Sequence, residues 1–267
     1  MTQDPDASGL AAALLEAYDS GRPLAPLSGR IHGFDAATAC RVAHEITARR
    51  TARGERRIGR KIGFTNRSIW PIYGVTGPIW GPVWDTTLLE LSDVPVDLPN
   101  LPEPRLEPEI ILGLKSAPSA GMTLEELAKC IDWVSHGFEI VFSPFPGWKF
   151  DVTDCQAGFG LHGALFTGPR LPLTPERAAA LPTLSITLDG PDGKRLTGRG
   201  SDVLDGPLQA LSYLLDTLAA DPQATPLDPT EIITTGTLTD AVPLSPGDTW
   251  ETCLDGIDLP GAKITFR

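Results

Sequence analysis

Three glutamates near the middle of the chain have the spacing and surroundings of metal ligands. Glu107 and Glu109 stand two residues apart at the start of an apolar run, residues 105–114, which is typical of a buried strand. In a strand, residues two apart point to the same face, so these carboxylates project side by side. Glu139 lies in another short apolar run, where a carboxylate without a partner would be costly to bury.

Converging carboxylates repel one another, and a hard divalent cation would relieve that repulsion. Ligation by oxygen alone suits Mg²⁺ or Mn²⁺. Spacing alone leaves a second interpretation open, because a glutamate pair two residues apart is a common pattern. In that interpretation Glu107 and Glu109 lie on a solvated face and Glu139 pairs with an arginine.

Lys61 is a candidate for contact with a substrate. It lies in residues 58–63, a predicted short strand bounded by glycines, where its aliphatic stem can pack inside. The alternative is a surface lysine in a basic run with Arg56, Arg57 and Arg60. Downstream, residues 65–85 are rich in Trp, Pro and Gly, and Trp80 could belong to an aromatic wall or lid over a site or simply pack at an interface.

The N-terminal part of the chain is predicted to be helical. Ser8 can cap a helix that ends at Gly21, and Asp35 can cap a second helix over residues 36–53. These helices form a small N-terminal cap, residues 1–57. Strands dominate the remainder, residues 58–267, without the regular strand–helix alternation of a parallel sheet, so an α+β class is predicted.

Further elements surround the candidate ligands. Thr123 and Glu126 form a capping box, which predicts a helix that runs to about Val134 and delivers the chain to Glu139. The last third is predicted to contain a hairpin around the turn at residues 189–193, a helix, and three strands at residues 231–235, 249–254 and 263–266. The helix covers residues 206–220.

Composition excludes several kinds of partner. The chain has 267 residues and a formal net charge of −12, which argues against binding to nucleic acid or to an anionic membrane surface. Its four cysteines show no C-x-x-C spacing, so neither a zinc site nor a disulfide scaffold is indicated. With no apolar run of membrane-spanning length and no signal pattern at the start, a cytoplasmic protein is expected. An anionic substrate would therefore need a local cation, such as a metal ion with Lys61.

The sequence around the first two glutamates resembles a known signature. Residues 104–110, Pro-Arg-Leu-Glu-Pro-Glu-Ile, are similar to the P-[RK]-[IL]-E-x-E-[IL] motif of the fumarylacetoacetate hydrolase superfamily. From about Arg30 onward, further stretches resemble the branch that contains 2-hydroxypenta-2,4-dienoate (2-keto-4-pentenoate) hydratases and 4-oxalocrotonate decarboxylases. These stretches are residues 60–65, residues 137–141, residues 148–150 with Asp154, residues 235–237 and residues 242–248.

The resemblance implies a fold and a set of roles. The fold is a rolled, mainly antiparallel β-sandwich core behind a small helical N-terminal segment, in a homo-oligomer (a dimer or higher). The implied metal ligands for Mg²⁺ or Mn²⁺ are Glu107, Glu109 and Glu139. The implied catalytic residues are Lys61, Lys149 and Asp154, with His162 added below, and the implied substrate-binding residues are Thr235, Gly236, Thr237 and Trp80.

Two departures from the branch pattern concern the residues that handle protons or water. Ile79 occupies the position where the branch usually carries an Asp. The Asn and Ser expected after Asp154 are also missing, and Leu161 precedes a new histidine, His162. The pKa of histidine suits proton transfer near neutrality, so His162 is predicted to replace the lost groups, with a packing role as the alternative.

The predicted function is a metal-dependent hydratase that acts on a small 2-hydroxydienoic or 2-oxoalkenoic acid through a metal-bound enolate. A decarboxylase or a carbon–carbon hydrolase of a related 2-oxo acid needs the same core, so both stay open. A binding or structural protein that has lost catalysis is a third possibility, favoured by Ile79 and Leu161 and opposed by Lys61 with three intact glutamates.

Overall fold

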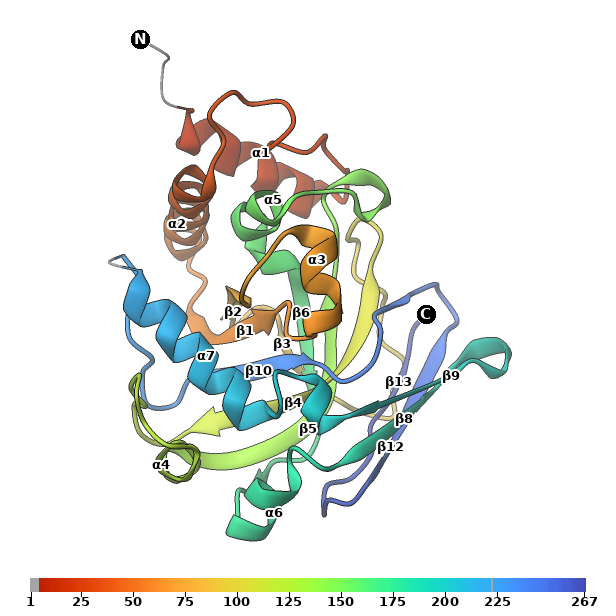
Figure 1. The fold of residues 1–267 in the computed structure, drawn as a ribbon. Coiled ribbons are helices and arrows are strands. Elements are labelled where there is room, and N and C mark those ends of the chain that lie inside the picture. Colours follow the sequence, from red (N-terminus) through yellow and green to blue (C-terminus); the bar gives the residue numbers. More distant parts are fainter. Residues whose placement is uncertain (1–4, 222) are drawn as a thin grey trace.

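A large curled sheet carries most of the residues singled out above. The computed structural model describes residues 5–221 and 223–267, and in that part nine strands form this sheet, with the order β2-β1-β10-β4-β5-β6-β3 and with β11 and β7 paired to β4 and β5 (Figure 1). Its strands are β1 (Arg57–Gly63), β2 (Ile79–Trp84), β3 (Leu88–Glu90), β4 (Arg105–Leu114), β5 (Ile131–Val141), β6 (His162–Thr167), β7 (Leu171–Pro172), β10 (Ile232–Thr237) and β11 (Val242–Pro243).

A second, four-stranded antiparallel sheet lies beside it in the order β13-β12-β8-β9. Its strands are β8 (Ser185–Asp189), β9 (Arg195–Arg199), β12 (Thr249–Asp255) and β13 (Lys263–Thr265). Strands β8 and β9 form the predicted hairpin. The α+β class is confirmed, and the large sheet is curled and mostly antiparallel, although β1 pairs with β10 and β3 with β6 in parallel. The β-sandwich is not confirmed as the description of this core.

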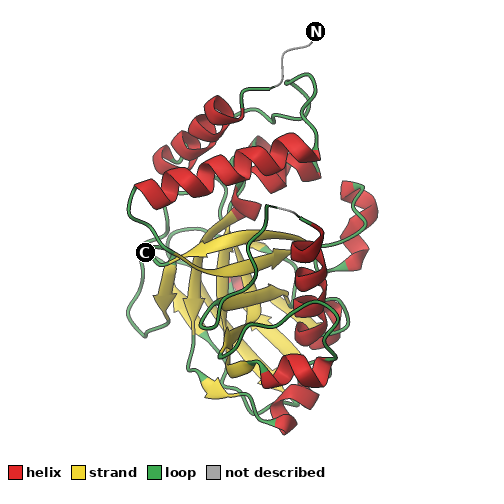
Figure 2. Ribbon diagram, turned by 90° about the vertical axis from the view of Figure 1, so that its left-hand side faces the viewer, coloured by secondary structure: helices red, strands yellow, loops and turns green. Residues whose placement is uncertain are grey.

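Helices cover the sheets at one end and along one side (Figures 1 and 2). They are α1 (Ala7–Ser20), α2 (Ala36–Ala52), α3 (Trp70–Tyr73), α4 (Leu124–Lys129), α5 (Val152–Ala157), α6 (Pro175–Ala180) and α7 (Pro207–Ala220). Asp35 caps α2 as predicted, whereas α1 is capped by Asp6 instead of Ser8. Apolar residues of α1 and α2, among them Leu14 and Val42, pack with Phe142 beyond the end of β5.

The helix predicted up to Val134 is shorter than expected. Its capping box between Thr123 and Glu126 is present, but α4 ends at Lys129 and β5 begins at Ile131. Strand β5 pairs with β4 on one side and with β6 on the other, so these long-range ladder bonds override the local helix signal. This correction matters for the site, because it places Glu139 near the end of an eleven-residue central strand.

No helix in the described part of the chain combines the length and the hydropathy needed to cross a membrane. The division into a cap of residues 1–57 and a catalytic domain of residues 58–267 stays a prediction.

Candidate metal centre and active-site cavity

Strand register brings the three predicted metal ligands together. Glu107 of β4 lies directly opposite Glu139 of β5, and Glu109 follows two residues further along β4. One carboxylate oxygen from each of the three lies within 4.8 Å of the others. Glu109 and Glu139 are completely buried, whereas Glu107 is half-buried and lines a cavity. The alternative in which Glu107 and Glu109 face solvent is therefore wrong.

A bulge in β10 holds the carboxylate of Glu109. The backbone N–H of Gly236 donates to Oε2 of Glu109 at 2.7 Å, and the hydroxyl of Thr234 donates to the same oxygen. Gly236 has a φ of +107°, and a Cβ there would lie 2.0 Å from Oγ1 of Thr65, so the bulge requires glycine. Oε1 of Glu109 is buried and has no hydrogen-bond partner among the described residues.

Lys61 reaches the carboxylates from β1. Its side chain is buried, with Nζ 3.4 Å from Oε2 of Glu139, and that oxygen makes no hydrogen bond within the described residues. Burial lowers the pKa of Lys61, but the three carboxylates, Glu139 foremost, raise it by more. Lys61 is thus a buried cation, and the shift is opposite to the lowered pKa that a role in proton transfer would need.

The carboxylates destabilise one another's charge. Burial, followed by repulsion from a neighbouring glutamate, raises the pKa of Glu107 to about 7 against the attraction of Lys61. The pKa of Glu139 is raised to about 7 for the same reasons, and burial followed by repulsion from Glu139 raises the pKa of Glu109 well above its usual value. Buried oxygens without donors, oxygen ligation alone and mutual repulsion together fit a hard divalent cation.

A cavity of about 290 Å³ opens in front of Lys61 and Glu107. Part of its wall is aromatic, formed by Phe64, Tyr73, Trp148 and Phe150. Tyr73 contacts both phenylalanines, with ring centroids 5.0 Å from Phe64 and 5.6 Å from Phe150.

The two departures from the branch pattern meet in the same cavity. Ile79 and Leu161 both line it, and both pack against Cys155, so they form one apolar section of wall. The sequence indicated each substitution separately, but their contact follows only from the fold.

Arg105 is a cavity residue that the sequence analysis did not single out. Its guanidinium lies 4.1 Å from the ring centroid of Trp148 and makes no hydrogen bond or ion pair within the described residues. Trp148 has a φ of +56°, and its indole N–H donates to the backbone oxygen of Glu103 at 3.1 Å. The signal was available, because Arg105 stands two residues before Glu107 in a strand and so shares its face.

Of the remaining predicted site residues, some line the main cavity and others do not. Gly236 and Thr237 line the cavity, whereas the hydroxyl of Thr235 donates to the backbone oxygen of Ile110. Trp80 lines a different pocket of about 170 Å³, and Lys149 is not among the residues that line the main cavity.

Asp154 is buried and fastens the loop before α2 to α5. Its Oδ1 accepts hydrogen bonds from the backbone N–H groups of Leu27 at 2.7 Å and Ser28 at 3.0 Å. Its Oδ2 accepts from the Ser28 hydroxyl at 2.6 Å. These contacts are those of an anchor for the N-terminal segment.

His162 lies behind the carboxylates. Its Nδ1 is 2.7 Å from Oε1 of Glu139, and its Nε2 is 2.8 Å from Oγ1 of Thr87. The ring is 1% exposed and does not line the cavity. Burial, followed by the nearby charges of Lys61 and Arg50, holds the pKa of His162 well below its usual value.

Known proteins are similar to this chain in sequence and in fold. No protein-family model matches the chain. The 2-hydroxyhexa-2,4-dienoate hydratase of Comamonas testosteroni is 32% identical over 259 residues, which cover 94% of this chain and 95% of that protein. The chain belongs to the family of 2-keto-4-pentenoate and related dienoate hydratases. Another hydratase of this family, the 2-keto-4-pentenoate hydratase of Burkholderia vietnamiensis, is 30% identical and covers 99% of the chain and 100% of its own length.

A solved structure agrees with this assignment. The 4-oxalocrotonate decarboxylase from Pseudomonas putida G7, complexed with magnesium and adipate, superposes on the hydratase-family chain with a TM-score of 0.89. It is 26% identical and covers 98% of this chain and 97% of its own. The branch predicted from the motifs is thereby confirmed.

Proposed function

We propose that the chain is a hydratase of small 2-hydroxydienoic or 2-oxoalkenoic acids that depends on Mg²⁺, with Mn²⁺ as a substitute. The observation that carries the proposal is the group of three glutamates beside Lys61 at one cavity, in a chain that belongs to a hydratase family. A magnesium complex of the related decarboxylase supports the choice of ion.

Glu107, Glu109 and Glu139 would hold the ion. When bound there, a divalent cation supplies a positive charge that polarises the 2-oxo group of a substrate. Lys61 donates hydrogen bonds from its ammonium to the substrate carboxylate or to the C2 oxygen, and it keeps its proton because its pKa is raised. Arg105 offers free guanidinium donors to a carboxylate and is held in place by Trp148. The aromatic wall keeps bulk water away from these charges, which strengthens their interactions.

The apolar section of wall favours substrates with an apolar tail. Ile79 and Leu161 replace polar residues of the branch pattern, and together with Cys155 they make this part of the cavity apolar. Each additional buried methylene contributes about 0.8 kcal/mol, or about fourfold in kcat/KM. We therefore expect the hexadienoate substrate to be preferred over the pentadienoate by about this factor.

Arg105 also favours a second candidate, decarboxylation of a 2-oxo dicarboxylic acid. Its guanidinium, which makes no hydrogen bond or ion pair with the described residues, could bind the additional carboxylate of such a substrate. The related structure is a decarboxylase that holds a dicarboxylate, adipate.

A spectrophotometric screen with Mg²⁺ and with EDTA distinguishes these activities. The substrates would be 2-hydroxypenta-2,4-dienoate, 2-hydroxyhexa-2,4-dienoate and 4-oxalocrotonate. Loss of the conjugated chromophore without release of CO₂ supports the hydratase, and release of CO₂ supports the decarboxylase. No turnover of any of them by protein shown to contain metal would contradict both and favour a binding protein.

The assembly, the location and several residue roles stay predictions: the homo-oligomer, the cytoplasmic location, and the catalytic or substrate-binding roles of Lys149, Asp154, Thr235 and Trp80. Light scattering of the purified chain tests the first.

A further inference from the structure

His162 is a buried polar residue to which the proposed mechanism gives no task. Its neutral ring carries one N–H, and its two nitrogens contact Oε1 of Glu139 and Oγ1 of Thr87. A carboxylate that holds a metal ion is ionised and only accepts hydrogen bonds, so with the ion bound the ring proton would lie on Nδ1 and be donated to Glu139. Nε2 then accepts a hydrogen bond from the hydroxyl of Thr87 at 2.8 Å, and this proton is drawn from the competing acceptor, the backbone oxygen of Trp84 at 3.0 Å.

We propose that His162 is a positioning residue that orients the Glu139 carboxylate for metal binding. The role rests on the proposed metal site. Glu109 and Glu139 are held in the same manner: one oxygen of each accepts hydrogen bonds from the chain, and the other, buried, accepts none among the described residues. Gly236 and Thr234 hold Glu109, and His162 holds Glu139. The two oxygens left without donors are then available to one cation.

The ring of His162 is itself braced by the turn after β2. The backbone N–H of Trp84 donates to Oγ1 of Thr87 at 3.2 Å, which orients the threonine toward His162. The guanidinium of Arg50 lies over the indole of Trp84, with the guanidinium carbon 4.8 Å from the ring centroid.

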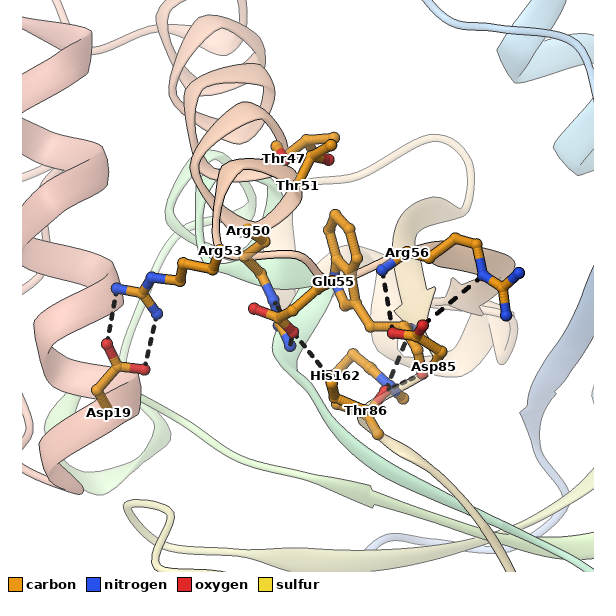
Figure 3. A network of polar contacts seen from close by, with 12 residues as sticks. Asp19, Thr47, Arg50, Thr51, Arg53, Glu55, Arg56, Asp85, Thr86 and His162 are labelled. Carbon is orange, nitrogen blue, oxygen red and sulfur yellow. Dashed lines mark hydrogen bonds and ion pairs between the residues drawn. The ribbon is translucent and has the colours of Figure 1, made fainter.

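The end of α2 also contacts the turn that follows β2. Arg50 forms an ion pair with Glu55 at 2.5 Å, and the hydroxyl of Thr86 donates to Glu55 at 2.7 Å (Figure 3). Figure 3 draws His162 together with Thr86, Glu55 and Arg50 of this network. The N-terminal helices therefore support a metal ligand through a continuous set of contacts.

Two substitutions separate the nitrogens of His162. In His162→Asn the side-chain amide nitrogen can take the place of Nδ1 and donate to Glu139. In His162→Gln the side-chain amide oxygen can take the place of Nε2 and accept from Thr87, so that contact is kept and the donor to Glu139 is lost. With Mn²⁺ as the probe, measured by electron paramagnetic resonance and calorimetry, His162→Gln should lose affinity by about 10–100-fold. His162→Asn should stay within about threefold of the wild type, since the donor to the ligand is retained.

His136 provides a matched control. It is also buried in the large sheet, and its Nε2 lies 2.8 Å from Oγ1 of Thr252. Its Nδ1 lies 2.9 Å from the backbone oxygen of Glu109 and does not contact the carboxylate. His136→Gln should lower the melting temperature about as much as His162→Gln and leave the affinity for Mn²⁺ within about threefold. Thr87→Val, a milder change that removes only the hydroxyl, should weaken Mn²⁺ binding by less than His162→Gln.

Equal affinity of His162→Gln and the wild type for Mn²⁺ would overturn this role and leave the metal site intact. Equal losses in His162→Asn, His162→Gln and His136→Gln would also overturn it, because they would indicate general destabilisation. If His162→Gln fails to fold, an unchanged Mn²⁺ affinity in Thr87→Val would contradict the role. Absence of Mn²⁺ binding by the wild-type chain would overturn the proposed metal site and this role together.

Discussion

Arg60 and Lys61 are adjacent residues of β1 that carry buried cations to opposite faces of the sheet. Arg60 donates from Nη1 to Glu231 at 2.9 Å, and Arg57, which is partly exposed, lies 3.6 Å from the same carboxylate oxygen. Lys61 instead faces three carboxylates. If all of these groups are ionised, three carboxylates against one ammonium leave an excess of two negative charges on the Lys61 side.

Two adjacent residues of β1 thus bury a charge in different ways. Around Arg60 the chain supplies its own counter-charge, and the leftover positive charge belongs to Arg57, which water can reach. Around Lys61 the three carboxylates outnumber the cations even when Arg105 of the cavity wall is counted, so an excess of negative charge remains. The first is an ion pair that stabilises the fold, and the second is the proposed metal-binding site.

The largest effect is expected from Arg60→Met. It leaves the buried carboxylate of Glu231 without its nearest cation, and breaking a buried pair in this way costs about 3–5 kcal/mol. Urea unfolding measures the loss, and Arg60→Met/Glu231→Leu, which removes both charges, should recover most of it. Affinity for Mn²⁺ should stay unchanged in the single variant. A tenfold loss of that affinity would show that the two faces are not independent.

Lys61→Met should have the reverse profile. It keeps a stem of similar length but removes the hydrogen-bond donor from the cavity, so turnover should fall by about 100-fold. With saturating Mg²⁺, its free energy of unfolding should change much less than that of Arg60→Met, because the bound ion offsets most of the carboxylate charge. Steady-state kinetics and urea unfolding in the same buffer measure both quantities. Near-normal turnover would make Lys61 a structural residue.

The smallest effect is a pH dependence confined to the Lys61 side. The pKa values of Glu107 and Glu139 are raised to about 7, so both carboxylates take up protons as the pH falls through 7. A metal ion must then displace those protons, and its affinity should fall by about tenfold per pH unit for each proton released. Calorimetry in buffers of different ionisation enthalpy measures the protons. An affinity that stays constant from pH 8 to pH 5.5 would contradict the raised pKa values.

Local patterns in the sequence predicted what lies on each face of a strand. The glutamate pair of β4, the cap of α2 and the hairpin of β8 and β9 depend on neighbouring residues and were predicted correctly. Pairing between distant strands was beyond such patterns. The pairing that sets Glu107 against Glu139 and the strand that replaces the end of the expected helix both depend on contacts made only in the folded sheet.

His162 and Arg105 illustrate the same limit from two directions. His162 has the pKa of a proton donor in water, but burial and nearby cations keep it neutral, and it lies behind a ligand instead of in the cavity. Arg105 stands two residues before Glu107, at the basic position of the quoted signature, but only the fold shows that it lines the cavity and lies against Trp148. Sequence spacing gives a direction for each side chain, whereas its surroundings come from tertiary structure.

The most direct test of the metal centre is anomalous diffraction from crystals of the wild-type chain grown with Mn²⁺. The account predicts one strong peak within coordination distance, about 2.0–2.3 Å, of oxygens from Glu107, Glu109 and Glu139. The same peak should be absent from Glu109→Ala crystals prepared identically. A peak at another site, or none between these three glutamates at saturating Mn²⁺, would contradict the account.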